Sequence, residues 1–476
     1  MTAGENRLIF ESETNQNITK FQKTTSYFCF FVLGASILLP WNSLLVSSNY
    51  FGSRLKGSQF EFTYINWLTL VFTFFNVSFI TKATFNQDSR PTRTILLSLT
   101  SIVLLSMTLL ISTKIEDLKA KTFFSFLIII TFLEAISSAY LQNSVIAISS
   151  WFGPSCLQAI LSGQGAIGAI VSLLQLLSSL REFKVDEETN SMISSIPVRT
   201  NQDKIRNSSY TFYLTVTIFT IFALLCFFTL SNLPFYKFVI KFNKKADNDE
   251  GQLISENDDA LSRAPLLRQS LEADLTTTLL KPTNLRLVER KIRSLGLGVF
   301  YVFFITLSVF PSITGSIISS SSNSSLKGNS NLWDNWTNPL IFIPIHFVCF
   351  NFGDWFGRVL PLLLPTISNL LISNHKTLIN LSFSRTCFIP LFLLCNVQNN
   401  SLVIFNSDLI YFIFLSTFSI TNGYFSTLLM IAGVTHSKLE PREVDIAATC
   451  MSLYLTFGLA MGSFVSFAVK ALTKLL

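Results

Sequence analysis

Long apolar runs, separated by short polar segments, occupy most of this 476-residue chain. A helix needs roughly 20 such residues to cross the hydrocarbon core of a bilayer. Charged residues make up only 13% of the sequence, whereas a soluble domain usually has about 25%. The 47 phenylalanines also suit a lipid-facing surface better than a compact core. The sequence therefore predicts a polytopic membrane protein embedded in a lipid bilayer.

Eleven apolar segments are long enough to be membrane-spanning helices. They comprise residues 25–48, 61–82, 94–113, 122–149, 155–180, 210–235, 294–318, 339–364, 378–396, 404–433 and 446–471. The fourth, fifth and tenth are rich in Ser and Ala, which allows helices to pack closely. The predicted fold is an all-α polytopic membrane protein with eleven transmembrane helices in a 6+5 arrangement.

The longest polar segment, residues 237–292, separates the six spans from the five. It has no apolar periodicity, which predicts a flexible cytosolic loop. The expected organisation is a cytosolic N-terminal segment (1–24), a first helical bundle (25–236), this loop, and a second helical bundle (293–476). Transporters commonly have two such bundles, and bind their substrate between them near the membrane midplane.

The basic residues indicate how the chain is oriented. With a cytosolic N-terminus, most of the 35 Lys and Arg residues fall in inner segments, as the positive-inside rule requires. This assignment counts Arg385 as an inner-loop residue and leaves Arg358 as the one basic residue in the membrane. The first polar residues contain no apolar core with a cleavage site, so the first span is expected to act as an uncleaved signal anchor.

Composition excludes several classes of function. The net charge of +7 is spread over loops, which does not indicate a nucleic-acid partner. The seven cysteines lie in apolar segments without metal-site spacing, so we expect buried small side chains and neither disulfides nor metal ligands. No His–Asp or acidic metal cluster lies near a membrane interface. We therefore expect no cofactor and no enzymatic activity.

The segment "FNFGDWFGRVLP", residues 350–361, carries two charges inside the eighth span. On a helix, Asn351, Asp354 and Arg358 share one face, and Asp354 and Arg358 have the i, i+4 spacing at which an acid and a base meet. Each charge at the bilayer centre costs about 3 kcal/mol, so neither should face lipid. Two interpretations follow: a clasp between helices, or a recognition site for an uncharged ligand that has several hydroxyl groups.

Two other segments place polar or aromatic groups within spans. In "LLPWN", Trp41 follows a helix-interior proline, and is either an interfacial residue or a stacking surface for a flat ring. Gln142 lies in a helix rich in small residues and is either an interhelical bond or a ligand contact. The "SGQGAIG" run, residues 162–168, is a packing face. Glu134 and His346 could relay protons, but partnered structural roles are favoured.

Together these motifs resemble the equilibrative nucleoside transporter family. "LLPWN" is similar to the family's first-helix signature, and "FNFGDWFGR" to its eighth-helix signature. "LQNS", "SGQGAIG", "NGYFSTLLMIAG" and "EVDIAATCMSLYLTFGLAMGSFVSF" resemble the fourth, fifth, tenth and eleventh helices in the same order. The match covers most of the apolar chain. Ser138 departs from the pattern, since the best-known animal members have Gly there.

The resemblance implies a major-facilitator-like carrier that moves nucleosides, and sometimes nucleobases, by alternating-access facilitated diffusion. It implies a substrate site at the following positions: Leu38, Trp41, Leu45, Gln142, Asn351, Asp354, Arg358 and Leu459. In this implied site Trp41 lines the cavity, Gln142 bonds the base, and Asp354 and Arg358 take the ribose hydroxyls. A monomer without cofactor is expected.

Three alternatives remain open. The cargo could be a sugar or another neutral polar solute, transport could be coupled to protons, or the chain could be a receptor without flux. The absence of a clear acidic dileucine motif favours the plasma membrane over a vacuolar, lysosomal or other internal membrane.

Overall fold

The computed structural model describes residues 20–61, 63–86, 91–115, 118–191, 198–240, 285–320, 336–397 and 403–472. The first half contains α2 (Lys20–Val46), α3 (Ser48–Leu55), α4 (Tyr64–Phe85), α5 (Pro91–Ser112), α6 (Ala120–Trp151), α7 (Pro154–Ser191) and α8 (Val198–Asn232), and residues 234–240 after α8 are also helical. The remaining helices are α11 (Leu285–Val309), η1 (Thr314–Ser316), α12 (Pro339–Leu363), α13 (Pro365–Ser373), α14 (His375–Ser384), η3 (Arg385–Cys387), α15 (Phe388–Leu393), α16 (Asp408–Val434), η4 (Pro441–Glu443) and α17 (Val444–Leu472). The protein is therefore an all-helical membrane protein, as predicted.

The number of single spanning helices is lower than predicted. Nine helices in the described ranges are long and apolar enough to cross a membrane, or up to ten if the bent pair α12–α13 is one span. The ninth predicted span, 378–396, is divided among α14, η3 and α15, so no single helix there reaches the required length. Three consecutive short helices cover this region because the chain tightens into a 3-10 turn at η3.

Most of the predicted central loop, 237–292, cannot be compared with the structure, because residues 241–284 lie outside the described residues. The described residues at the edges of this segment are helical: helical residues extend to position 240 on one side, and α11 begins at Leu285 on the other. The first turns of α11 carry charged residues, which is why hydropathy alone assigned them to the loop.

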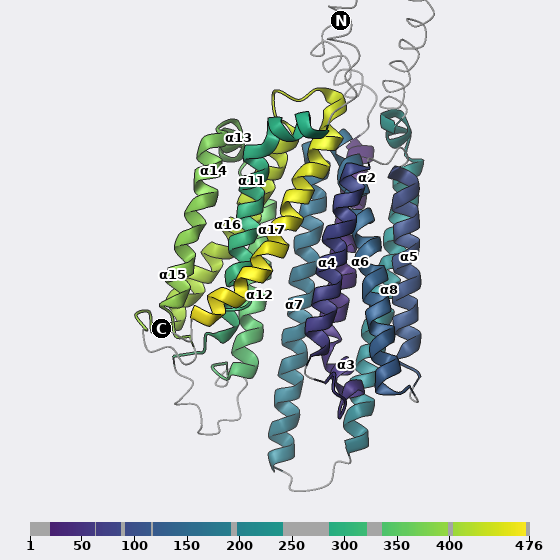
Figure 1. Ribbon diagram of the computed structural model, residues 1–476, viewed down its shortest axis with the longest axis vertical. Coiled ribbons are helices and arrows are strands. Elements are labelled where there is room, and N and C mark those ends of the chain that lie inside the picture. Colours follow the sequence, from purple (N-terminus) through teal and green to yellow (C-terminus); the bar gives the residue numbers. More distant parts are fainter. Residues whose placement is uncertain are drawn as a thin grey trace, which may run out of the picture.

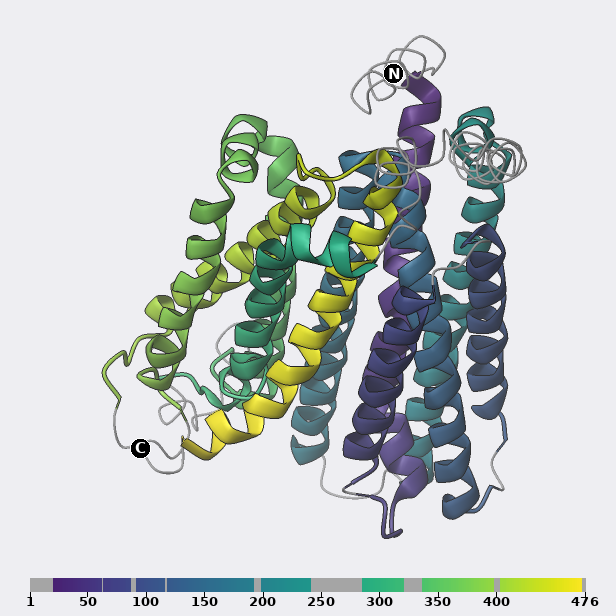
Figure 2. The same cartoon turned by 45° about the horizontal axis from the view of Figure 1, so that its top comes forward.

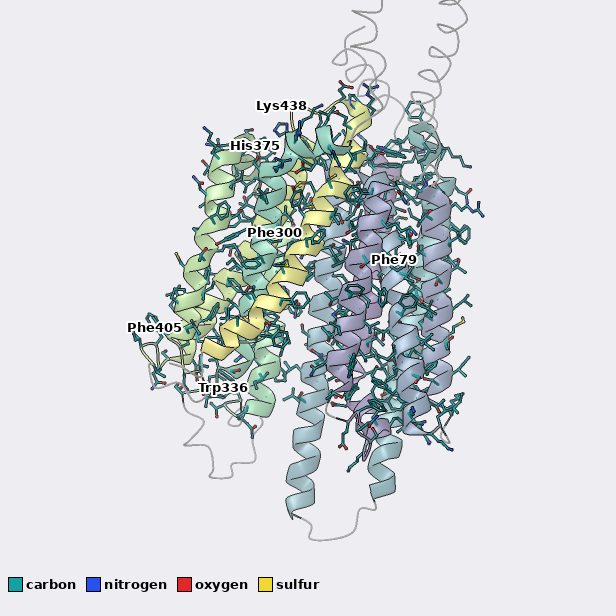
Figure 3. The ribbon with its side chains drawn as sticks, viewed as in Figure 1. Phe79, Phe300, Trp336, His375, Phe405 and Lys438 are labelled. Atoms are coloured by element: carbon teal, nitrogen blue, oxygen red, sulfur yellow. The ribbon has the colours of Figure 1, made fainter. Side chains whose placement is uncertain are left out.

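Two groups of helices stand side by side (Figures 1 and 2): α2–α8 form the first half, and α11–α17 form the second. In both views α17 is inclined, so that its C-terminal end lies further from the first half than its N-terminal end. Figure 3 labels His375 and Lys438 at one end of the molecule, called here the upper face, and Trp336 and Phe405 at the other, the lower face. The first described helix, α2, begins at the upper face.

The two halves meet along α7 and α12, which run antiparallel, and along α17, which packs on α4 and α6. We call the first of these contacts the seam, formed by residues 158–168 of α7 and 351–358 of α12. Below the seam, apolar side chains of α7 are exposed, such as Ile170 at 52% and Leu177 at 48%.

Glycines allow the closest helix contacts, as the small-residue runs predict. A Cβ atom at Gly163 would overlap the Phe31 carbonyl oxygen of α2, which belongs to the same half. One at Gly165 would lie 2.9 Å from Arg358 Cδ, on the opposite half. One at Gly423 of α16 would overlap the Asp354 carbonyl oxygen of α12. Such contacts bring helix backbones within reach of short polar side chains.

Candidate functional site

Asp354 and Arg358 form the buried ion pair that their spacing predicts. Arg358 Nε donates to Asp354 Oδ2 at 2.9 Å, one turn away on α12. The two residues are 7% and 6% exposed, so both charges are withdrawn from solvent and from lipid. An isolated charge at this depth would be strongly unfavourable, but each group here neutralises the other. The two opposite charges therefore compensate each other within a single helix.

The same pair also lies at the seam between the halves. Arg358 Nη1 donates to the Leu161 carbonyl oxygen of α7 at 3.1 Å. In return, Gln158 Nε2 of α7 donates to the Arg358 carbonyl oxygen at 3.0 Å. Gly165 leaves room for the arginine stem against α7. A charged group of the second half is thus held by uncharged groups of the first.

A network of polar groups extends from Asp354 into the second half. Asn422 Nδ2 of α16 donates to Asp354 Oδ1 at 2.6 Å, so both carboxylate oxygens accept a hydrogen bond. The Thr306 hydroxyl of α11 lies 2.7 Å from Asn422 Oδ1. Arg385 Nη2 donates to the Thr306 hydroxyl at 2.9 Å. Three helices and the η3 turn therefore contribute to one network.

Sequence reasoning missed Arg385 and Asn422 as parts of this site. Arg385 was assigned to an inner loop, but the structure buries it to 1% exposure between α11 and α16. The assignment of Arg358 as the one basic residue within the membrane was therefore wrong. The available signal was that Arg385 falls inside the apolar segment 378–396. Asn422 lies in a quoted motif, but its partner on another helix could not be read from the sequence.

Gln142 joins the two halves at a second place. Its Nε2 donates to the Ser452 hydroxyl at 2.8 Å, and lies 3.3 Å from the Thr456 hydroxyl, both on α17. Of the two interpretations of Gln142, the interhelical bond is therefore present in this structure. The residue is 6% exposed, and its amide belongs to the contact between α6 and α17.

Trp41 is half-buried on α2, and its ring stacks on Phe72 of α4, with centroids 4.7 Å apart and planes 30° apart. The indole thus has an aromatic neighbour within the first half. Leu38 and Leu45 lie on the same helix, and both are half-buried. Leu459 is half-buried on α17.

Asn351 lies on α12 at the far end of the seam from Arg358. Its Nδ2 donates to the Phe347 carbonyl oxygen at 2.8 Å, one turn back on the same helix. Its Oδ1 faces Gly168 of α7, where a Cβ atom would lie 3.0 Å away. Asn351 therefore extends the polar face of Asp354 and Arg358 along the contact with the first half.

Glu134 and His346 occupy different environments. His346 Nδ1 lies 3.1 Å from both the Thr314 carbonyl oxygen and the Tyr411 hydroxyl, in an aromatic cluster of the second half. Glu134 is 2% exposed in the first half, and its Oε2 has no hydrogen-bond partner within the described chain. His346 thus has partners at Nδ1, whereas His346 Nε2 and Glu134 Oε2 are both buried without a hydrogen-bond partner among the described residues.

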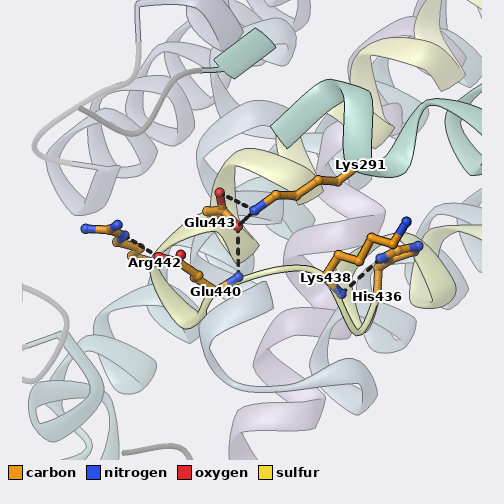
Figure 4. Close-up of polar contacts among 6 residues, drawn as sticks. All are labelled: Lys291, His436, Lys438, Glu440, Arg442 and Glu443. Carbon is orange, nitrogen blue, oxygen red and sulfur yellow. Dashed lines mark hydrogen bonds and ion pairs between the residues drawn. The ribbon is translucent and has the colours of Figure 1, made fainter. Parts of the chain in front are cut away.

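A separate ionic cluster lies at the upper face (Figure 4). Lys291 Nζ of α11 lies 2.6 Å from Glu443 Oε2, next to the start of α17. Glu443 also accepts from the Glu440 backbone N–H at 2.8 Å, as part of a capping box. The His436 and His375 rings are 5.0 Å apart. Burial, followed by the nearby His375, Lys438 and Lys291, lowers the pKa of His436.

Comparisons with known proteins agree with this architecture. Residues 127–471 match a family model described as Nucleoside transporter. Equilibrative nucleoside transporter 1 of Rattus norvegicus is 27% identical over 484 residues, which cover 93% of this chain and 96% of that protein. Equilibrative nucleoside transporter 2 of Homo sapiens is 28% identical over 480 residues, with 93% and 96% covered.

Solved structures support the fold. The human organic anion transporter MFSD10 aligns with a TM-score of 0.53 at 14% identity, over 95% of each chain. The major facilitator superfamily proton:xylose symporter XylE aligns with a TM-score of 0.51 at 10% identity, over 95% of this chain and 94% of that one. The predicted major-facilitator-like fold is confirmed.

Proposed function

The chain belongs to the equilibrative nucleoside transporter family, and we propose on that basis that it carries nucleosides across a membrane by alternating-access facilitated diffusion. Nucleobases are a second proposed cargo. A nucleoside presents a flat ring, hydrogen-bonding edges and ribose hydroxyls, and it has no net charge. The ring, its hydrogen-bonding edges and the hydroxyls each correspond to a kind of side chain in the proposed site.

The observation that carries this proposal is the Asp354–Arg358 pair at the seam. A carboxylate accepts hydrogen bonds from hydroxyl groups, and a guanidinium donates them in a fixed planar fork. A neutral ligand can use both groups without bringing a counter-charge that would break the pair. We therefore assign the ribose to Asp354 and Arg358, with Asn351 on the same face.

The other site residues follow from the same reading. Trp41, with Leu38 and Leu45, is proposed to contact the base from α2, and Leu459 to face the substrate from α17. Gln142 is proposed to bond the base when its contact with Ser452 opens. This double role is consistent with alternating access, in which contacts between halves form and break once per cycle.

We also infer eleven membrane segments in a 6+5 arrangement. In this arrangement α14, η3 and α15 together form the ninth, and the bent pair α12–α13 contributes the eighth. The N-terminus and the connection between the halves lie on the cytosolic side, which makes the upper face cytosolic. The protein is proposed to act as a monomer in the plasma membrane, which surface biotinylation and size measurement in detergent can test.

Purified protein in liposomes tests the function directly. We expect saturable entry of labelled uridine and adenosine, competed by unlabelled nucleosides and not by glucose. Competition by glucose, with no effect of nucleosides, would instead identify a sugar carrier. The same panel at two external pH values separates facilitated diffusion from proton coupling, because only the coupled carrier should concentrate its substrate when a pH gradient is imposed.

A further inference from the structure

Arg385 is buried in the second half, and among the described residues no carboxylate is in direct contact with it. Its guanidinium donates from Nη1 to the Phe418 carbonyl oxygen at 2.8 Å and to the Thr421 hydroxyl at 2.5 Å. It also lies over the Phe418 ring at 4.5 Å. The other terminal nitrogen, Nη2, contacts the Thr306 hydroxyl at 2.9 Å and Asn422 Oδ1 at 3.4 Å. One side of the guanidinium is thus anchored in α16, and the other points towards Asn422.

These contacts determine which way the Asn422 amide faces. Its oxygen lies 3.4 Å from Arg385 Nη2, which can only donate, and 2.7 Å from the Thr306 hydroxyl, whose one proton the Asn422 oxygen shares with the Val302 carbonyl oxygen. Its nitrogen is therefore on the side of Asp354, to which it donates at 2.6 Å. A flipped amide would place NH₂ against the guanidinium and a carbonyl oxygen against the carboxylate, two repulsive contacts. Arg385 and Thr306 therefore fix Asn422 as a donor to Asp354.

The position of Asp354 is consequently set from two sides. Arg358 donates to Oδ2 and Asn422 donates to Oδ1. Each carboxylate oxygen can accept more than one hydrogen bond, so further acceptor positions remain for a ligand hydroxyl. With both oxygens held, the carboxylate cannot rotate, and these positions point in fixed directions.

We propose that Arg385 and Asn422 are positioning residues, which hold the Asp354 carboxylate in the orientation that accepts the ribose hydroxyls of a nucleoside. This inference rests on the proposed function and extends it, because it makes recognition of the sugar depend on a residue that does not touch the substrate. The effect passes from Arg385 through Thr306 and Asn422 to Asp354.

The test compares ligands that differ only in the ribose. The KM for labelled uridine and the inhibition constant of 2′,3′-dideoxyuridine are measured for each variant in liposomes, at matched protein density. For Asn422→Ala, loss of a hydrogen bond to a charged group should raise the KM for uridine about tenfold. The inhibition constant of dideoxyuridine should stay within about twofold of the parent value, because that ligand lacks the 2′ and 3′ hydroxyls that would donate hydrogen bonds to Asp354.

The chain offers a matched control for Arg385. Thr306 and Thr421 both place a hydroxyl on its guanidinium, but only Thr306 also bonds Asn422. Thr306→Val should raise the KM for uridine several-fold while dideoxyuridine is little affected, and Thr421→Val should leave both values near those of the parent. These nearly isosteric variants test the inference without replacing the buried Arg385 itself.

The outcomes separate this inference from the proposed function. Failure of the parent protein to take up uridine would overturn the proposed function, and this inference with it. If the parent takes up uridine but Asn422→Ala and Thr306→Val lower the affinities for uridine and dideoxyuridine equally, the positioning role alone is overturned. Equal effects of Thr306→Val and Thr421→Val would do the same, since both would then act on the fold.

Discussion

The two halves of the molecule contribute different chemistry to their common boundary. The first half offers uncharged groups: the Gln142 and Gln158 amides and the Leu161 carbonyl oxygen. The second half offers charges, Asp354 and Arg358, and keeps that ion pair within one helix. Every side-chain hydrogen bond described here across the boundary has an uncharged group on at least one side.

This difference bears on how the halves can separate. Breaking a buried ion pair leaves an uncompensated charge and costs about 3–5 kcal/mol. A hydrogen bond between neutral groups contributes only about 1 kcal/mol. In the proposed cycle Asp354 and Arg358 stay together on α12. The bonds that break at the seam are those of Arg358 Nη1 to the Leu161 carbonyl oxygen and of Gln158 Nε2 to the Arg358 carbonyl oxygen. A hydrogen bond to a charged group contributes about 1.5–3 kcal/mol, which is still less than the cost of breaking the ion pair.

The largest effect on the comparison between the two halves should come from removing the carboxylate of the ion pair. Asp354→Ala should abolish nucleoside uptake, because it removes the proposed ribose acceptor and leaves the Arg358 charge buried alone. Uptake of labelled uridine per molecule at the cell surface measures the effect. The exposed ion pair Arg442–Glu440 supplies the control, and Arg442→Ala should be without effect. Normal uptake by Asp354→Ala would refute the role in recognition.

The contribution of the first half is tested at its aromatic residue. Trp41→Ala should lower the affinity for purine nucleosides about tenfold, because a lost stacking contact costs about 1–1.5 kcal/mol. Trp67, which is 50% exposed on α4, is the matched control, and Trp67→Ala should leave affinity unchanged. Equal affinities for adenosine in Trp41→Ala and the parent would show that the indole packs on Phe72 and does not bind substrate.

The bonds across the boundary are expected to have smaller effects. Gln142→Leu should shift the balance between joined and separated halves about fivefold, since one hydrogen bond contributes about 1 kcal/mol. Spin labels on the lower face of each half can report that balance. Ser452→Ala should produce the same shift if the contact is structural, whereas a change in base selectivity confined to Gln142→Leu would identify a substrate contact.

The smallest effect concerns the upper face of the second half. Burial and nearby positive groups lower the pKa of His436 below its usual 6.5. The unfolded chain therefore binds protons more readily, and the folded state loses stability as the pH falls below about 6.5. The melting temperature of His436→Asn should depend less on pH between 7 and 5.5 than that of the parent. Parallel curves would show that His436 does not contribute.

Much of the fold could be predicted because local patterns determine it. Apolar length identified the helices, and the i, i+4 spacing brought Asp354 to Arg358 without knowledge of any other element. The glycine run on α7 was correctly interpreted as a packing face. Each of these inferences needs only the geometry of one helix.

The rest of the site depends on contacts between distant segments. Arg385 meets Thr306 and Asn422 only because three separate helices pack together, and no spacing within the sequence encodes that meeting. Gln142 could be recognised as an important polar group, but its partner on α17 could not. Hydropathy also cannot show that the ninth predicted span is interrupted by η3, because the interruption preserves the apolar composition.

The glycine face of α7 has one more consequence. Gly163 packs within its own half, whereas Gly165 and Gly168, two and five residues further on, pack against the opposite half. At Gly165 an added methyl group would press on the Trp355 Cα atom and the Arg358 side chain across the seam, whereas at Gly168 it would meet the end of the Asn351 side chain, which can turn aside. If the halves separate and rejoin as proposed, Gly165→Ala should therefore favour the separated arrangement, although it changes the chain by a single methyl group.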